Sequence, residues 1–344
     1  MSDLAPSQVP TQDAVAPGDE PTRGSSLGRY LLSKAAGAVV SLLMVVVLGF
    51  FAFRVLPGDP AITMTRGRRV TAADVERIRA ELGLDQPWYT QFWRYLTDLV
   101  QGNLGTSFTY ERPVTQLIAE RVGSTVLLTG TAAVISVLLG LWLGQRAAWK
   151  RGTTMDKVST GTALVNWSVP TFWLGLLLLM LLGGPFPTGG MVTPGLGATG
   201  LAWVLDVARH LVLPVTTMVA VTYAQYLMTM RSSMLEEMTA DYLTTARAKG
   251  LNEDAVRTRH AVPNALLPTV TLIFLTLGHL VGGAITVETV FSWPGLGYLT
   301  YQALSTPDLP LLQGTFVVFS SIVVVMNFLA DLVYRVLDPR LKAA

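Results

Sequence analysis

The sequence predicts an all-α integral membrane protein that crosses the membrane six times. Only 14% of its 344 residues are charged, whereas a typical soluble domain carries about 25%. The charges are also unevenly spread, and they leave six long stretches that carry none. A helix needs about 20 apolar residues to cross the hydrocarbon, and each stretch supplies at least one such segment. Barrel strands would be short and alternating, so the spans must be helices.

The charge-free stretches set the positions of the spans. They are Ala35–Phe53, Val122–Gln145, Val158 up to Asp206, Leu211–Met230, Ala261–Val287 and Leu309–Ala330. GGPFPTGG at Gly183–Gly190 interrupts the third stretch, so we expect one span before it and a loop after it. Pro170 and Pro214 fall inside or at the edge of the third and fourth spans. Each removes a backbone hydrogen bond there and favours a kink.

Four regions follow in chain order. Residues 1–28 contain few large apolar side chains and are expected to be a disordered cytoplasmic tail. Residues 29–56 form the first span, and residues 57–120 an extracellular helical insertion between spans 1 and 2. Residues 121–338 form the transmembrane core with the other five spans, and include a cytoplasmic segment at 231–268.

The orientation follows from Lys and Arg, which favour short cytoplasmic loops. Such residues occur before span 1, between spans 2 and 3, between spans 4 and 5, and after span 6. They are Arg23, Arg29, Lys34, Arg146, Lys150, Arg151, Lys157, Arg231, Arg247, Lys249, Arg257, Arg259, Arg335, Arg340 and Lys342. Both termini are therefore expected in the cytoplasm. Residues 54–121 carry nine Arg, but that segment exceeds about 60 residues, where the rule loses force.

The insertion is expected to contain two helices. The first begins at Thr71, a good N-cap with Asp74 three residues on, and ends at Gly83. The second runs between Pro87 and Gly102 and is rich in aromatic residues. Two interpretations remain open for it: a helix at the membrane interface, where Trp and Tyr collect, or a docking surface for an outside partner. The candidate contact residues are Trp88, Tyr89, Phe92 and Trp93.

Several kinds of chemistry are excluded or disfavoured by the residues present. The chain has no cysteine, which removes disulfides and thiol chemistry, and no G-x-x-x-x-G-K-[ST] loop for phosphate. GLGATG at Gly195–Gly200 lacks a preceding strand and is interpreted as a turn. His279 lies within span 5. It is either a neutral histidine packed on a helix face or a functional polar residue within the membrane. Gly140–Gly144 and Gly278–Gly282 are G-x-x-x-G sequences that indicate close helix packing or a partner helix.

The polar segment between spans 4 and 5 predicts a compact cytoplasmic hairpin. Asp241 to Lys249 is acidic first and basic last, which suits a helix dipole. Gly250 then supplies a left-handed stop, and Asn252 caps a second helix. Tyr242, Ala246 and Gly250 are four residues apart and would form a stripe that fits a groove on another protein. A charged hairpin without a partner is the alternative.

Several segments of the sequence resemble those of a known protein family. TARAKGL at Thr245–Leu251, followed by NALLP at Asn264–Pro268, resembles the EAA-type motif of ABC importer permeases, with Thr245 where the motif's name puts glutamate. Further segments are similar to the B-type permease of dipeptide and oligopeptide importers. They are RVLPGDP (Arg54–Pro60), LGLDQPWYTQF (Leu82–Phe92), VPTFWLG (Val169–Gly175), ETVFSWPGLG (Glu288–Gly297) and DLVYRVLDPRLK (Asp331–Lys342).

The resemblance implies the type I ABC importer permease fold in the cytoplasmic membrane. It implies a second permease, two ATPase subunits that use ATP and Mg, and an extracellular solute-binding protein; the chain itself would be non-catalytic, bind no cofactor and contact no nucleic acid. The residues implied in ATPase coupling are Tyr242, Ala246, Arg247, Ala248, Lys249, Gly250 and Leu251. Peptides are the implied solute, and nickel, opines or oligosaccharides are the alternative. The implied role of residues 57–115 is to meet the binding protein.

Two other expectations concern the outer loop and other classes of protein. FSWPGLG (Phe291–Gly297) is either an outer gate or a plain structural turn, and its candidate residues are Phe291, Trp293, Pro294 and Gly295. A stand-alone channel would need charged or carbonyl rings along a pore. A membrane enzyme would need carboxylates or histidines that converge within the spans. The sequence favours neither.

Overall fold

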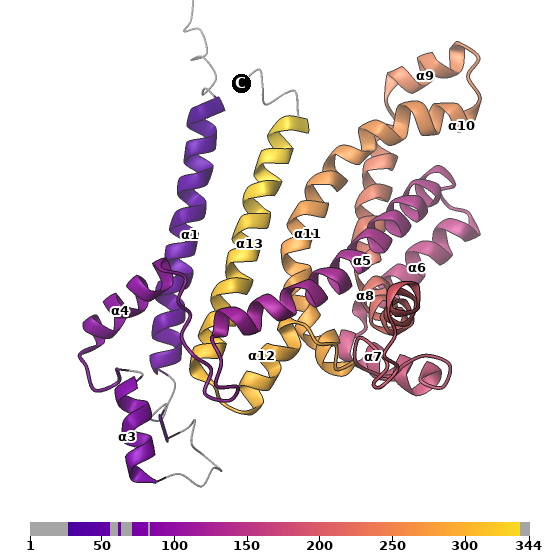
Figure 1. Cartoon of the computed structure of the whole chain (residues 1–344). Helices are drawn as coiled ribbons and strands as arrows, with labels where there is room; N and C mark the ends of the chain where they lie inside the picture. The colour runs from indigo at the N-terminus through magenta and orange to yellow at the C-terminus, as the bar shows by residue number, and fades with distance from the viewer. Residues whose placement is uncertain (1–26, 56–60, 63–70, 82, 338–344) are drawn as a thin grey trace, which may run out of the picture.

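The computed structural model describes residues 27–55, 61–62, 71–81 and 83–337, and its regular structure is helical (Figure 1). The helices are α1 (Leu27–Val55), α3 (Ala72–Glu81), α4 (Trp88–Val100), α5 (Val114–Trp149), α6 (Thr154–Ser168), α7 (Thr171–Leu182), α8 (Gly200–Glu237), α9 (Asp241–Ala248), α10 (Glu253–Val256), the π-helix η1 (Arg257–Ala261), α11 (Val262–Val290), α12 (Leu296–Ser305) and α13 (Leu309–Leu337). Among these residues, β structure is limited to one isolated bridge between Thr106 and Pro113.

Long apolar helices confirm a multi-span architecture. Within the described residues, α1, α5, α8 and α13 are each long and apolar enough to cross a membrane, and the bent pair α6–α7 makes a fifth span if it is counted as one. The remaining expected span lies in α11, a helix of 29 residues. The structure does not describe some side chains of α11, including that of His279, or the surroundings of Gly278 and Gly282.

The third expected span is broken. One span with a kink at Pro170 was expected there, and α6 and α7 meet at an angle of 104°. Pro170 is the N-cap of α7, and Val169 before it is in an extended conformation. Proline disfavours helical geometry in the residue that precedes it, which accounts for a break at this point. Pro214, by contrast, lies inside the continuous helix α8.

Packing of α5 against α8 forms the centre of the molecule. A Cβ built on Gly140 would lie 2.5 Å from Cβ of Tyr226, and one on Gly144 would lie 2.7 Å from the carbonyl oxygen of Leu227. The backbones therefore approach as closely as glycine permits, as in small-residue membrane interfaces. The Gly140–Gly144 sequence serves internal packing, which confirms one of its two expected uses.

The insertion contains the two expected helices. The helix of span 2 begins before residue 121, where the core was expected to start. Thr71 and Asp74 cap α3 reciprocally: the Thr71 amide donates to Oδ2 of Asp74 at 2.9 Å, and the Asp74 amide donates to Oγ1 of Thr71 at 3.3 Å. However, α5 already begins at Val114, after Pro113, and continues without interruption past residue 121. Proline is well suited to a helix start, so the span-2 helix extends beyond the charge-free stretch.

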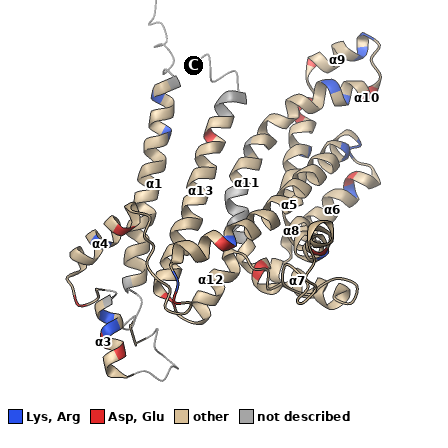
Figure 2. Cartoon of the chain, in the orientation of Figure 1, with Lys and Arg blue, Asp and Glu red and all other residues tan. Residues whose placement is uncertain are grey.

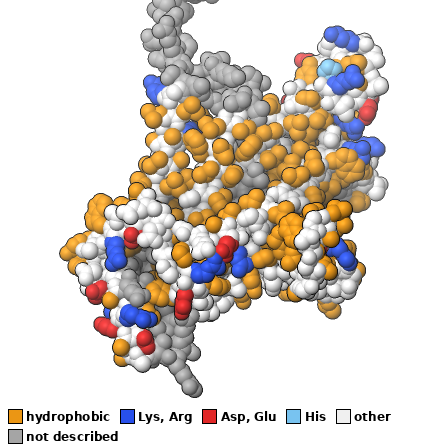
Figure 3. All heavy atoms as spheres, viewed as in Figure 1, with side chains coloured by type: hydrophobic (Ala, Val, Ile, Leu, Met, Phe, Trp, Pro, Cys, Tyr) orange, Lys and Arg blue, Asp and Glu red, His pale blue; other side chains and the backbone are white. Residues whose placement is uncertain are grey.

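The two ends of the molecule differ. Figure 1 shows the first turn of α1, the last turn of α13 and the α9–α10 hairpin at one end, with α3 and α12 at the other. Charged side chains are sparse along the long helices between these ends (Figure 2). Figure 3 shows hydrophobic side chains covering much of that middle region. Both described chain ends and the polar hairpin therefore share one side of the apolar zone.

Candidate functional site

The candidate site is the hairpin formed by α9 and α10, which projects from one end of the molecule (Figure 1). Asp241 lies in the first turn of α9 and Arg247 in its last, which complements the helix dipole. Gly250 ends the helix with φ of +80°. Its amide donates to the carbonyl oxygen of Arg247 at 2.9 Å, and the Leu251 amide donates to that of Ala246 at 3.4 Å. This pair of bonds is the Schellman arrangement, which requires a left-handed residue at the glycine position.

The second arm of the hairpin is continuous with a membrane helix. Asn252 caps α10, as expected, by accepting from the Ala255 amide at 2.8 Å. The two expected helices of the hairpin are present, and α10, η1 and α11 follow one another without a break, so the second arm continues into α11. Pro263 lies in the first turn of α11, directly after the π-helix η1.

The inner face of α9 is packed against the rest of the chain. Leu243 is fully buried and Ala246 is 5% exposed. Both belong to an apolar cluster with residues from α5, α8, α10, η1 and α11. The other buried members are Ala148, Met230, Met234, Val256, Ala261 and Ala265. This cluster fixes α9 to the ends of the long helices.

The expected stripe of Tyr242, Ala246 and Gly250 is interrupted, because Ala246 is buried whereas Tyr242 and Gly250 are exposed. Four-residue spacing placed them on one face, but the structure turns Ala246 inward, because its small side chain permits close packing of α9 on the cluster. The exposed residues of the segment are Asp241, Tyr242, Thr244, Thr245, Arg247, Ala248, Lys249, Gly250 and Leu251.

Polar contacts fix the geometry of the hairpin. Nε of Arg247 lies 2.9 Å from Oε1 of Glu253, which joins α9 to α10 across the turn. The same guanidinium lies 5.9 Å from the ring centroid of Trp149, at the end of α5. Both partners are partly exposed, so the ion pair contributes less to stability than to the angle between the helices.

Tyr242 connects α9 to its two neighbouring helices. Its hydroxyl donates to Glu237, at the end of α8, and accepts from Nδ2 of Asn264, in α11, at 3.0 Å. Burial raises the pKa of the Tyr242 phenol, and the hydrogen bond to Glu237 raises it further. The phenol therefore stays protonated and keeps its donor role at physiological pH.

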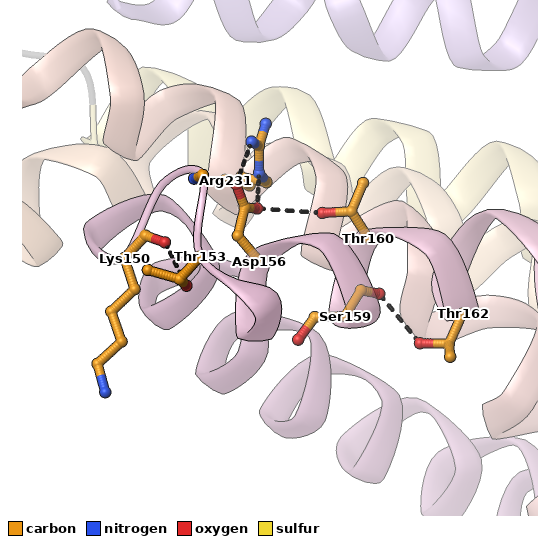
Figure 4. Close-up of polar contacts among 8 residues, drawn as sticks. Lys150, Thr153, Asp156, Ser159, Thr160, Thr162 and Arg231 are labelled. Carbon is orange, nitrogen blue, oxygen red and sulfur yellow. Dashed lines mark hydrogen bonds and ion pairs between the residues drawn. The ribbon is translucent and has the colours of Figure 1, made fainter.

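An ion pair below the hairpin joins two further elements (Figure 4). Asp156, in the first turn of α6, is 5% exposed. Nε and Nη2 of Arg231, on α8, donate to its two carboxylate oxygens at 2.7 and 2.9 Å. The Gly152 amide also donates to Oδ2 of Asp156 at 3.0 Å, and the Thr160 hydroxyl to Oδ1 at 3.3 Å. The α5–α6 loop is thereby tied to α8 six residues before α8 ends.

Sequence reasoning missed this contact. It treated Arg231 only as a cytoplasmic positive charge and gave Asp156 no role. A weak signal was present, because Asp156 is an isolated acidic residue at the start of a long charge-free stretch. Its partner is 75 positions away, and neither periodicity nor spacing links the two.

The outer loop after α11 is a densely bonded turn. The fully buried Glu288 accepts from the Thr125 hydroxyl at 2.7 Å and from the Tyr298 amide at 3.0 Å. The Leu296 amide donates to Oγ1 of Thr125 at 2.8 Å, and Nε1 of Trp293 donates to the Ser124 carbonyl oxygen at 2.9 Å. One turn of α5 therefore fixes the end of α11 and the start of α12.

The four candidate gate residues all lie in this turn. Phe291 and Trp293 are buried, Pro294 is half-buried, and Gly295 lies where a Cβ would collide with the Glu288 carboxylate. The loop that follows α7 also contacts the turn, through the Gly190 amide and the Phe291 carbonyl oxygen at 3.0 Å. The arrangement supplies the structural turn that was one of the two expectations.

The aromatic residues of α4 have two different environments. Phe92 contacts Phe50 of α1, with ring centroids 5.2 Å apart. It attaches α4 to α1 and is only partly accessible. Trp88 and Trp93 are each 62% exposed, and Tyr89 is also exposed. The exposed set therefore excludes one of the four residues expected at the outer docking surface.

Neither a metal site nor an obvious catalytic group emerges from the described part of the chain. Those residues contain no group of three or more His, Cys, Asp or Glu side chains placed to hold a metal ion. The fold and the projecting hairpin instead define a class: a multi-span membrane protein that presents a structured polar segment at one end.

Comparison with known proteins identifies the family. Residues 136–343 match the family described as "Binding-protein-dependent transport system inner membrane component", and residues 27–129 match the N-terminal family of such membrane components. A putative peptide permease of Brucella suis is 39% identical over 319 residues, which cover 91% of this chain and 99% of that protein. The glutathione transport system permease protein GsiC of Pectobacterium atrosepticum is 38% identical over 317 residues, with 91% and 98% covered.

A solved structure supports the fold. A chain of the MetNI methionine ABC transporter, in an inward-facing conformation, superposes with a TM-score of 0.52 at 17% identity, and covers 65% of this chain and 97% of that one. The chain described here belongs to the family of inner-membrane components of binding-protein-dependent transport systems. It is a multi-pass transport permease with the fold of ABC importer permeases.

Proposed function

We propose that the chain is a permease subunit of an ATP-driven importer for di- or oligopeptides. The single observation that carries this proposal is the similarity over almost the whole chain to a putative peptide permease, at 39% identity. The relative named for glutathione transport supports the same solute class, because glutathione is itself a small peptide.

The proposed arrangement pairs this chain with a second permease, with the solute path between the two. An extracellular binding protein delivers the solute at the end that carries α3 and α12. The hairpin and both chain termini lie on the cytoplasmic side. The shared location of the hairpin and both described chain ends, together with their Lys and Arg residues, supports this orientation (Figures 1 and 2).

ATP hydrolysis is assigned to two partner subunits that bind ATP and Mg, while this chain contributes the coupling surface. The exposed residues Thr244, Ala248, Lys249 and Leu251 offer a contact area of mixed polarity at the end of a short, rigid helix. Arg247 fixes its angle, and the continuous α10–η1–α11 segment carries a displacement into the membrane.

A pull-down tests the assembly. The tagged chain is extracted in mild detergent, and the proteins that co-purify are identified by mass spectrometry. We expect a second permease, one or two ATPase sequences and a binding protein. A chain that purifies alone would contradict the proposal. Uptake of a labelled dipeptide by cells with and without the chain tests the solute, and unchanged uptake would contradict the peptide assignment.

A further inference from the structure

A cavity of about 440 Å³ lies between α3, α4 and the start of α13, at the end of the molecule opposite the hairpin. Figure 3 shows side chains of both charges gathered over α3 and α4. Cavities of roughly 300–1,000 Å³ are typical of small-molecule sites. The polar side chains that matter here are Asp85, Gln91, Arg94, Asp98, Asn103 and Gln313.

Two opposite charges in the cavity do not neutralise each other. Arg94 and Asp98 are one turn apart on α4, a spacing at which opposite charges commonly pair. Within the described part of the chain, neither forms an ion pair, and no hydrogen bond engages the Arg94 guanidinium or the Asp98 carboxylate. The guanidinium lies beside Gly83 instead, since a Cβ built on that glycine would be 3.7 Å from Nη1 of Arg94.

Two buried amide atoms in the same lining also lack partners. They are Oε1 of Gln91 and Nε2 of Gln313. Nε2 of Gln91 donates to the Gln86 carbonyl oxygen at 2.7 Å, which fixes the orientation of that amide and leaves its oxygen free to accept. Both atoms are buried in the wall of the cavity, so a ligand would contact them only after these side chains move, and the charges of Arg94 and Asp98 are the polar groups that face the cavity.

We propose that this cavity binds a short zwitterionic solute, an amino acid or a small peptide. The solute carboxylate is placed at Arg94 and its ammonium group at Asp98. The permease would then hold solute at its own outer end, in addition to any delivered by a binding protein. The inference rests on the proposed function for the choice of a peptide as ligand.

Direct binding to the purified full-length chain in lipid nanodiscs tests this inference without any partner protein. The probes are alanyl-alanine and the same dipeptide with an acetylated N-terminus and an amidated C-terminus, titrated by calorimetry. We expect saturable binding of the free dipeptide and loss of binding for the blocked one. Equal binding of both probes, or binding of neither, would overturn the proposal.

Two substitutions test whether Arg94 and Asp98 bind the charged ends of the solute. Arg94→Gln and Asp98→Asn should each weaken dipeptide binding by about tenfold or more, because each removes a charge-assisted hydrogen bond. Arg151→Gln is the matched control: Arg151 is an exposed arginine in the α5–α6 loop, at the other end of α5 from the cavity side. Unchanged affinity in both cavity variants would overturn the assignment.

The absence of cysteine allows an independent test of position. In a Gln86→Cys variant, alanyl-alanine should slow labelling by a maleimide, whereas labelling of Lys249→Cys should not change. Protection of Gln86→Cys by the binding protein alone, and not by the dipeptide, would show that the cavity receives a protein segment and would overturn the proposal. The pull-down outcome does not affect these measurements, so the two proposals can fail separately.

Discussion

Asp156 and Arg231 form a bidentate ion pair that connects the α5–α6 loop to α8 just before the hairpin. The carboxylate is almost fully buried and also accepts from the Gly152 amide. Removing one member of such a pair leaves the other without a partner in a poorly solvated position. The contact is therefore a structural joint at the base of the proposed coupling segment.

Asp156→Asn should lower the free energy of unfolding by about 2 kcal/mol or more, because it weakens charged hydrogen bonds. Thermal unfolding of the detergent-solubilised chain measures the change. Asp254→Asn is the control, since that side chain is 79% exposed. The double variant Asp156→Asn/Arg231→Gln should cost less than the sum of the single changes. Additive losses would show that the pair does not act as a unit.

Gly250→Val should uncouple ATP hydrolysis from uptake while the protein remains in the membrane. Valine at a φ of +80° costs about 1–2 kcal/mol and disrupts the turn that orients α9. Uptake and ATPase rate are measured on the reconstituted importer. Gly195→Val is the control, because Gly195, in the loop after α7, also has a positive φ, of +79°, and a Cβ there would meet open space. Normal transport by Gly250→Val would contradict the assigned role of this turn.

Gly140→Ala should destabilise the packing of α5 against α8. The added methyl group would lie 2.5 Å from Cβ of Tyr226 and 2.8 Å from the Tyr223 carbonyl oxygen, so the helices must separate. Overpacking of this kind costs about 1–3 kcal/mol. Gly130→Ala, on the same helix with open space around it, should be neutral or stabilising. Equal melting temperatures for the two variants would refute the close approach of α5 and α8.

Glu288→Gln should loosen the outer turn. An amide nitrogen replaces one of the two oxygens that accept from Thr125 and the Tyr298 amide, so one buried hydrogen bond is lost at a cost of about 1–3 kcal/mol. Limited proteolysis of the α11–α12 turn and thermal unfolding both measure the effect. Glu236→Gln is an exposed control on α8. The prediction fails if both variants unfold and are cleaved alike.

The sequence predicts the long helices well because charge-free length alone decides where a span can lie. It also predicts the local features that depend on neighbouring residues: the Thr71–Asp74 cap, the Gly250 stop and the Asn252 cap. Each feature depends on hydrogen bonds of the backbone that are formed by residues within five positions of one another.

Features that depend on distant contacts were missed or misjudged. The inward orientation of Ala246 follows from the cluster around Met230 and Val256, which the spacing within α9 does not reveal. The 104° break between α6 and α7 exceeds what a single proline predicts by itself. Phe92 contacts Phe50, which is distant from it in the sequence. The aromatic residues beside Phe92 therefore did not indicate that it attaches α4 to α1.

Cross-linking from the hairpin tests the central claim most directly. A Lys249→Cys variant of the chain, which otherwise has no cysteine, is purified with its partners and treated with a short thiol-directed cross-linker. Lys249 is the exposed C-cap residue of α9, and Glu76→Cys on α3 serves as the control at the opposite end. The account predicts a cross-link from Lys249→Cys to an ATPase subunit and none from Glu76→Cys. An ATPase that co-purifies but cross-links only from the opposite end, or from neither site, would contradict the assignment of α9 as the coupling surface.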